Sequence, residues 1–133
     1  MDKPRPKINP DNRPFWDGCD AGELRLPFCA QCTKPHLPPG PVCPFCFSGD
    51  LEWRPASGRG RISSWTIVYK AWFASFAEEV PYNVVQVELE EGPRLTANIV
   101  GLGERALVIG APVQVVFDRI DHDLVLPRFR LVE

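Results

Sequence analysis

Four of the five cysteines of this 133-residue chain stand in one stretch, CAQCTKPHLPPGPVCPFC, as two Cys-x-x-Cys pairs. The pairs are Cys29 with Cys32 and Cys43 with Cys46. Each tight turn directs both thiolates at one centre, so the pairs together offer four sulfurs to a tetrahedral Zn²⁺ at about 2.3 Å each. The proline-rich loop between them is stiff, which lowers the entropy lost when the four ligands converge. The pattern predicts a small metal-binding ribbon.

Two disulfides, a redox-active pair, or an iron centre with the same ligands are the alternatives to structural zinc. Two matched pairs in a chain with no apolar leader favour zinc, because thiols stay reduced in the cytoplasm, where we expect this protein. A closed four-sulfur shell has no position for water or substrate, so the metal is expected to be non-catalytic. We expect His36 to be a loop side chain and Cys19 a small buried residue.

Composition limits the classes of partner. The formal net charge is −2, which gives no long-range attraction for nucleic acid. No run of eighteen apolar residues occurs, so we expect no membrane span. Hydrophobic residues make up 44% of the chain and charged residues 24%, as in a folded globular protein.

The local composition of the sequence divides the chain into three parts. Most of the fifteen prolines lie in the first half, which predicts an irregular N-terminal region. Asp11 or Asn12 can cap a short helix over about 13–21. We expect three parts, namely an arm with this helix, a rubredoxin-like zinc ribbon and an OB-fold domain, over residues 1–22, 23–54 and 55–133.

Alternating apolar and polar residues in the third part predict half-buried strands. In 82–90, for example, Val85, Val87 and Leu89 fall on one face. Similar runs, separated by turn signals, cover 61–69, 95–99, 113–117 and 129–131. Five short strands in about 75 residues favour a small closed barrel of the OB type. The fold class is therefore mainly β.

Two segments of the predicted barrel have the chemistry of binding sites. The loop between the first two strands carries Trp72, Phe73 and Phe76, which either pack back on the barrel or form the interface with a partner. Arg59 and Arg61 flank Gly60 at the start of the first strand, where guanidinium groups could hold a phosphate. The alternative for these arginines is a solvated strand entrance.

A catalytic constellation is not recognisable. The chain has two histidines, and His122 stands in Asp121-His122-Asp123, which reads as a hairpin turn. Neither histidine accompanies a nucleophile motif, and no nucleotide-binding loop is present. We therefore expect no catalytic residues in this chain.

The order of motifs resembles the acyl-CoA-associated zinc-ribbon and OB-fold family known as DUF35, over about residues 12–131. Besides the cysteine pairs, the resemblance rests on Phe15-Trp16-Asp17-Gly18, Gly22-Glu23-Leu24, Pro38-Pro39-Gly40-Pro41, Ser57-Gly58-x-Gly60, Pro81-Tyr82, Val87-Glu-Leu-Glu-Glu-Gly92, Ile109-Gly110-x-Pro-Val113 and Leu126-Pro-x-Phe129. Thr33 and Phe47 depart from the pattern, because such cysteine turns often carry glycine there. They could strain the turns but remove no ligand.

The resemblance implies a non-catalytic zinc-binding subunit of a heteromeric enzyme that acts on acyl-CoA. The partner would be a thiolase or thiolase-like aldolase for a bulky aromatic or steroid-type acyl-CoA, as in a benzoylsuccinyl-CoA thiolase, assembled as a two-plus-two heterotetramer. A MaoC-like enoyl-CoA hydratase or a hydroxymethylglutaryl-CoA-type synthase is the alternative partner. In this reading the complex takes a coenzyme A thioester, Arg59 and Arg61 are candidates for its phosphates, and Trp72, Phe73 and Phe76 are interface candidates.

Two other classes compete with this reading. OB barrels and zinc ribbons also occur in single-strand nucleic-acid-binding proteins, but such sites need a basic groove, and the strands here carry Glu88, Glu90 and Glu91. An independent small-molecule enzyme is the other possibility, and no set of residues in the sequence suggests its catalytic roles.

Overall fold

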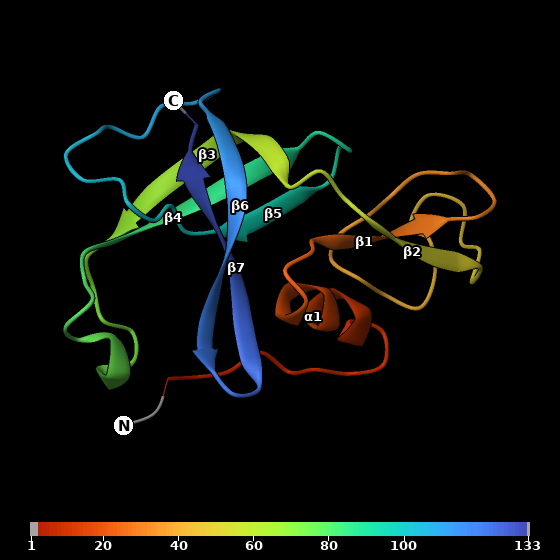
Figure 1. The fold of residues 1–133 in the computed structure, drawn as a ribbon, viewed down its shortest axis with the longest axis horizontal. Helices are drawn as coiled ribbons and strands as arrows, with labels where there is room; N and C mark the ends of the chain where they lie inside the picture. The colour runs from red at the N-terminus through yellow and green to blue at the C-terminus, as the bar shows by residue number, and fades with distance from the viewer. Residues whose placement is uncertain (1–2, 133) are drawn as a thin grey trace.

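The structure, a computed structural model, describes residues 3–132. A short helix comes first, a two-stranded ribbon follows, and a five-stranded antiparallel sheet rolled into a nearly closed barrel ends the chain (Figure 1). The expected mainly β fold, with a short helix, a four-cysteine ribbon and a five-stranded barrel, is confirmed.

The helix α1 (Arg13–Asp20) has proline in its first turn, where the ring fits the helical φ and no N–H is needed. Asn12 is the N-cap residue, but its side chain does not cap the helix. Instead, Oδ1 of Asn12 accepts from the Asn9 N–H at 2.8 Å, and Oδ1 of Asn9 accepts from the Asn12 N–H at 3.0 Å. The expected side-chain cap is therefore wrong, because a tight turn before the helix uses the same oxygen.

One face of α1 packs into the main core. Phe15 and Cys19 are buried in the same hydrophobic cluster as the barrel residues, and Trp16 meets the Phe15 ring edge-on at 5.1 Å between centroids. Burial raises the pKa of the Cys19 thiol to about 12, so it stays neutral. Cys19 is thus the small buried residue that we expected.

The ribbon is built from β1 (Arg25–Cys29) and β2 (Leu51–Pro55), which pair antiparallel with Cys29 opposite Leu51. Leu24 and Leu26 join the main core, so the base of the ribbon is continuous with it. The cysteine turns lie at the other end, away from the barrel (Figure 1).

The barrel has the strand order β5-β4-β3-β6-β7, and all neighbours are antiparallel. Its closure comes from a parallel bridge between Ile99 and Phe129, where the Val100 N–H donates to the Phe129 carbonyl at 2.8 Å. The strands are β3 (Arg59–Val68), β4 (Tyr82–Leu89), β5 (Arg94–Ala97), β6 (Pro112–Asp121) and β7 (Leu124–Leu131), with the 3₁₀ turn η1 (Ala74–Phe76) after β3.

The predicted alternation on β4 is confirmed. Val85 and Val87 are fully buried and Leu89 is 2% exposed, while Glu88 points to solvent. Strand β7 begins at Leu124, five residues before the predicted start at residue 129. Pro127 interrupts the alternation of apolar and polar residues in this segment, but the segment still pairs with β6 in a long hairpin. No helix in residues 3–132 is long and apolar enough to cross a membrane.

Candidate metal centre and flanking surfaces

The four predicted ligands converge at the tip of the ribbon. The Sγ atoms of Cys29, Cys32, Cys43 and Cys46 all lie within 4.8 Å of one another. The Sγ–Sγ distances are 3.5 Å for Cys29–Cys46 and 3.6 Å for Cys32–Cys43. A tetrahedron with Zn–S bonds of about 2.3 Å has edges of about 3.8 Å, so four sulfurs in this arrangement fit zinc. They lie too far apart to be disulfides, in which the sulfurs are about 2.05 Å apart.

The two cysteine turns have the same local structure. In the first turn, the Thr33 N–H donates to the Cys29 carbonyl at 2.9 Å, and in the second the Phe47 N–H donates to the Cys43 carbonyl at 2.8 Å. Backbone N–H groups also point at the first sulfur of each pair, from Gln31 to Cys29 and from Phe45 to Cys43, both at 3.4 Å. Such donors stabilise thiolates, which are the form that binds metal.

The pKa values of two ligands reflect this arrangement. The backbone N–H of Cys32 is the main cause that lowers the pKa of Cys29 to about 6, against some opposition from burial. Burial alone would raise the pKa of Cys43, but backbone N–H groups of Cys46 and Phe45 outweigh it, and the net direction is downward. Both shifts favour the thiolate, which is the form that binds metal.

His36 is not part of the four-sulfur cluster. It is nevertheless more buried than a loop residue, at 5% exposure, and neither ring nitrogen has a hydrogen-bond partner among the described residues. Burial lowers its pKa, which keeps the ring neutral at pH 7. No sequence signal distinguished this histidine from a solvated one.

The two candidate phosphate-binding arginines lie at the start of β3 with other partners. Arg59 binds Glu90 through Nε at 2.9 Å, and Nη1 of Arg61 donates to the Gly110 carbonyl at 2.8 Å. Gly60 between them faces inward, where a Cβ atom would lie 2.5 Å from the Glu88 carbonyl oxygen. The glycine is required by this close approach of two strands, and both arginine side chains remain accessible. Their phosphate role stays a prediction.

The aromatic loop after β3 divides into two groups. Phe76 folds back against Tyr82, with ring centroids 5.9 Å apart. Trp72 and Phe73 point outward and are 70% and 54% exposed. Tyr69 and Trp65 are also exposed, so four large aromatic side chains on and after the second half of β3 are largely open to solvent. Within the chain, Nζ of Lys70 lies 4.2 Å from the Trp72 ring centroid, and the Phe73 and Phe76 ring centroids are 6.3 Å apart. We call Trp65, Tyr69, Trp72 and Phe73 the aromatic surface.

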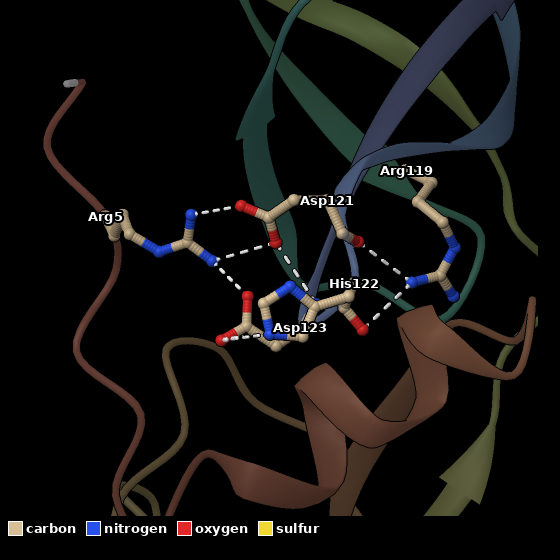
Figure 2. Close-up of polar contacts among 5 residues, drawn as sticks. All are labelled: Arg5, Arg119, Asp121, His122 and Asp123. Carbon is tan, nitrogen blue, oxygen red and sulfur yellow. Dashed lines mark hydrogen bonds and ion pairs between the residues drawn. The ribbon is translucent and has the colours of Figure 1, made fainter. Parts of the chain in front are cut away.

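A second cluster, at the tip of the β6–β7 hairpin, was missed by sequence reasoning as an interaction site. Asp121, His122 and Asp123 lie close enough to suggest a metal site, but the Arg5 guanidinium already binds both carboxylates, at 2.6 Å each (Figure 2). His122 is exposed in the turn, as expected for a hairpin. The cluster is therefore an anchor for the N-terminal arm.

Comparisons with known proteins agree with this architecture. Residues 16–52 match the family described as the ChsH2 rubredoxin-like zinc ribbon domain, and residues 53–118 match the ChsH2 C-terminal OB-fold domain. A solved structure titled "Ltp2-ChsH2(DUF35) aldolase" contains a chain that superposes with a TM-score of 0.85 and 38% identity, covering 96% of this chain and 98% of that one.

Two relatives contain a similar sequence, one as part of a longer protein and one over most of its length. A probable enoyl-CoA hydratase alpha subunit of Thermomonospora curvata is 38% identical over 128 residues, 96% of this chain, but the chain spans only 40% of that protein. A DUF35 domain-containing scaffold protein of Methanothermobacter thermautotrophicus is 38% identical over 96 residues, 71% of each chain. With its four-cysteine ribbon and five-stranded barrel, the chain belongs to the DUF35 family of zinc-ribbon and OB-fold proteins.

Proposed function

We propose that this chain is the non-catalytic, zinc-binding subunit of a heteromeric enzyme that acts on an acyl-CoA, with a thiolase-like aldolase or a thiolase as its catalytic partner. The observation that carries the proposal is the near-complete match to the DUF35 chain of an aldolase, at a TM-score of 0.85. Because the match covers 98% of that chain, it supports a similar role in a complex for the whole of this chain.

Two features of the site support a role without chemistry of its own. The four-sulfur shell is complete, so bound zinc has no free position at which to polarise a substrate. The metal instead supplies folding energy to a ribbon too small to be stable alone. The Asp121-His122-Asp123 cluster is held by Arg5, so both of its carboxylates already have a partner within the fold.

The aromatic surface is the proposed contact with the partner. Exposed large aromatic side chains are unfavourable in water and are typical of the centres of protein interfaces. Trp72 and Phe73 are the most suitable anchors, because the chain before β4 presents them outward while Phe76 holds the loop on the barrel. We expect a two-plus-two assembly and a bulky, aromatic or steroid-type acyl group.

A second candidate has a specific observation in its favour. The similarity to a probable enoyl-CoA hydratase alpha subunit supports a MaoC-like hydratase as the alternative partner. The two candidates differ in the enzyme that accompanies this chain and in the reaction, carbon–carbon cleavage or hydration.

The test is a mild affinity purification of the tagged chain from its own cells, followed by mass spectrometry and an assay with acyl-CoA substrates. We expect an equimolar thiolase-like or aldolase-like protein, or a hydratase for the second candidate. Trp72→Ala with Phe73→Ala should release the partner and leave zinc content unchanged, whereas the matched control Val108→Ala, at an exposed site on another loop, should not. Recovery of nucleic acid, or of no stoichiometric enzyme, would contradict the proposal.

A further inference from the structure

One edge of β3 has no neighbouring strand along its second half within residues 3–132. On that side β3 pairs with β6 over 59–61, and the Ile62 N–H then donates to the Ala111 carbonyl at 3.0 Å, in the loop before β6. After Ile62, β3 pairs with β4 alone, over 64–68. Within the described chain, no backbone group forms a hydrogen bond to 63–69 on the open side.

Hydrogen bonds at both ends of β4 fix the direction in which its backbone groups point. The Leu89 N–H donates to the Pro93 carbonyl at 2.9 Å, in the turn that leads to β5. The Asn83 carbonyl accepts from Nδ2 of Asn98, just after β5, at 2.6 Å. The odd-numbered residues of β4 therefore face β5. Because the backbone groups of successive strand residues point to opposite edges, the even-numbered residues face β3.

The register between the two strands then assigns the backbone groups of β3. The partners of the even-numbered residues of β4 are Ser64, Thr66 and Val68, whose N–H and C=O groups are therefore used within the sheet. The residues between them, Trp65 and Ile67, direct their N–H and C=O groups away from β4, to the open edge. Two donors and two acceptors thus lie along this edge, at a two-residue spacing of about 7 Å.

The open segment has the composition of a strand that pairs on both sides. Residues 63–69 read SSWTIVY, with no charge, proline or glycine, and the last five are all β-branched or aromatic. Ser64, Trp65 and Thr66 are all exposed. Since successive side chains point to opposite faces, both faces of the strand are open here as well as its edge. An uncharged edge of this kind is a template for pairing with another chain.

Strand β2 of the ribbon shows how the same chain protects another edge. Within the described residues β2 pairs with β1 alone, so its outer edge is also without a strand. It carries Glu52, Arg54 and Pro55, which are the residue types that block pairing between edges. The second half of β3 has none of these residue types. The contrast indicates that the open edge of β3 is suited to pairing and not protected against it.

We propose that the catalytic partner adds an extended strand to this edge, so that its backbone pairs with the N–H and C=O groups of Trp65 and Ile67. The proposal names the mode of contact for the partner of the proposed function, and it rests on that function. An extended backbone is the occupant that matches the edge, because it offers donors and acceptors at the same two-residue spacing. The aromatic surface continues from this strand into the following loop, so one partner can cover both.

A second copy of this chain fits the edge less well. In an antiparallel pair of copies centred on residue 66, residue 72 of one copy would lie opposite residue 60 of the other. At Gly60 the edge is already paired with Val113 of β6. A pair of copies would therefore stop short of Trp72 and Phe73, and the seven residues of 63–69 are few beside the roughly 20–30 residues per side in a stable interface. A different chain can follow the strand into the loop.

The first experiment is amide hydrogen exchange, read residue by residue by mass spectrometry with fragmentation. It compares the zinc-loaded chain alone with the complex purified from its own cells. In the free chain we expect Thr66 and Val68 to exchange slowly, because they pair with β4, and Trp65 and Ile67 to exchange fast. In the complex the amides of Trp65 and Ile67 should slow at least tenfold, since each then donates to the added strand.

The other outcomes separate this proposal from the proposed function. Slow exchange of Trp65 and Ile67 in the dilute free chain would show that the edge is already covered, and would overturn the proposal. Slowing that appears as the free chain is concentrated would assign the edge to a second copy and overturn it too. A complex with an acyl-CoA enzyme in which these amides stay fast would refute the added strand and leave the proposed function standing. A preparation without such an enzyme would contradict the proposed function, and the assignment of the edge with it.

A matched pair of variants separates the backbone from the side chain. Ile67→Pro removes the outward N–H and keeps an apolar side chain, and proline is tolerated on a strand edge where its nitrogen faces away from the sheet. Ile67→Ala removes most of the side chain and keeps the N–H. Ile67→Pro should weaken binding of the partner about tenfold, the upper range for one hydrogen bond, and Ile67→Ala less than threefold. Equal weakening in both would show that the backbone is not the contact. If Ile67→Pro fails to fold, the exchange experiment on the unaltered chain decides the question.

Discussion

Thr33 and Phe47 occupy equivalent positions, each four residues after the first cysteine of its pair, and both have left-handed backbone conformations with φ of 67° and 64°. Residues with a Cβ atom are strained in this region, and a branched side chain such as threonine more than most. Both turns nevertheless form the hydrogen bond that positions the sulfurs. The ribbon therefore contains two strained residues, each in a turn that a backbone hydrogen bond closes.

Replacing Thr33 with glycine should stabilise the zinc-loaded chain. Glycine adopts positive φ without strain, and we expect a gain of about 1 kcal/mol in the free energy of unfolding. Chemical denaturation with zinc present measures the change. Gln31→Gly, an exposed position of the same turn with ordinary backbone angles, should give no gain. A loss of stability in Thr33→Gly would mean that the threonine side chain makes a contribution larger than its strain.

Removal of one ligand should unfold the ribbon and spare the barrel. Cys43→Ser leaves three sulfurs, so we expect zinc content to fall well below one per chain and amide protection to disappear from β1 and β2. Strands β3–β7 should keep their protection, because their core is closed by backbone pairing independent of the metal. Cys19→Ala is the control, since that thiol lies in the core and outside the cluster. Full zinc content in Cys43→Ser would exclude the four-sulfur site.

The contact between Arg5 and Asp121 predicts a pH dependence of the docked arm. The side-chain hydrogen bond from Arg5 is the main cause that lowers the pKa of Asp121 below its usual 3.8. Because the pKa is depressed in the folded chain, the stabilising contribution is complete above pH 3.8 and is lost as the pH falls through the lower, folded value.

Carboxyl-carbon NMR measures this titration directly. Arg5→Gln should raise the pKa of Asp121 toward 3.8, whereas Lys3→Gln, whose partner is Glu79, should not. An unaltered Asp121 titration in Arg5→Gln would show that the arm is not docked on the hairpin in solution.

Phe129 is the side chain on which closure of the barrel depends most. It is fully buried, and its backbone bridges to Ile99 across the seam between β7 and the segment after β5. Phe129→Ala should lower the free energy of unfolding by about 3–5 kcal/mol, the range for truncating a buried aromatic residue. Val132→Ala, exposed near the end of the same segment, should change it by less than about 0.5 kcal/mol. A change of less than about 1 kcal/mol in Phe129→Ala would show that this side chain does not contribute to the barrel core as proposed.

Arg59 and Arg61 are tested in the reconstituted complex. If they hold CoA phosphates, the double change to alanine should raise KM for the acyl-CoA several-fold and leave kcat nearly unchanged, because the contact is remote from the reacting bond. Glu90→Gln should act in the opposite direction, since it frees Arg59 from its ion pair. Arg130→Ala controls for general loss of positive charge. An unchanged KM would remove both arginines from the site.

Local patterns in the sequence were sufficient for the ribbon and for most strands. The spacing of the cysteines predicted the four-sulfur cluster, and the alternation of Val85, Val87 and Leu89 predicted the inner face of β4. Both signals succeed because ligand spacing and strand periodicity are properties of neighbouring residues.

Contacts between distant residues were not predictable in the same way. Arg5 and Asp121 are 116 residues apart in sequence, and neither belongs to a motif that predicts contact with the other. The burial of His36 also depends on how the loop between the cysteine pairs folds against β1, where the His36 N–H donates to the Pro27 carbonyl. The Asn12 cap failed for a different, local reason, because the Asn9 N–H takes the side-chain oxygen that would have capped the helix.

The docking of the arm on the last hairpin has a consequence for the order of events during synthesis. Arg5 leaves the ribosome well before Asp121 and Asp123, to which it binds, because 116 residues separate Arg5 from Asp121. The ribbon can acquire its metal while the arm is still undocked, and the arm can settle only after the β6–β7 hairpin has been made.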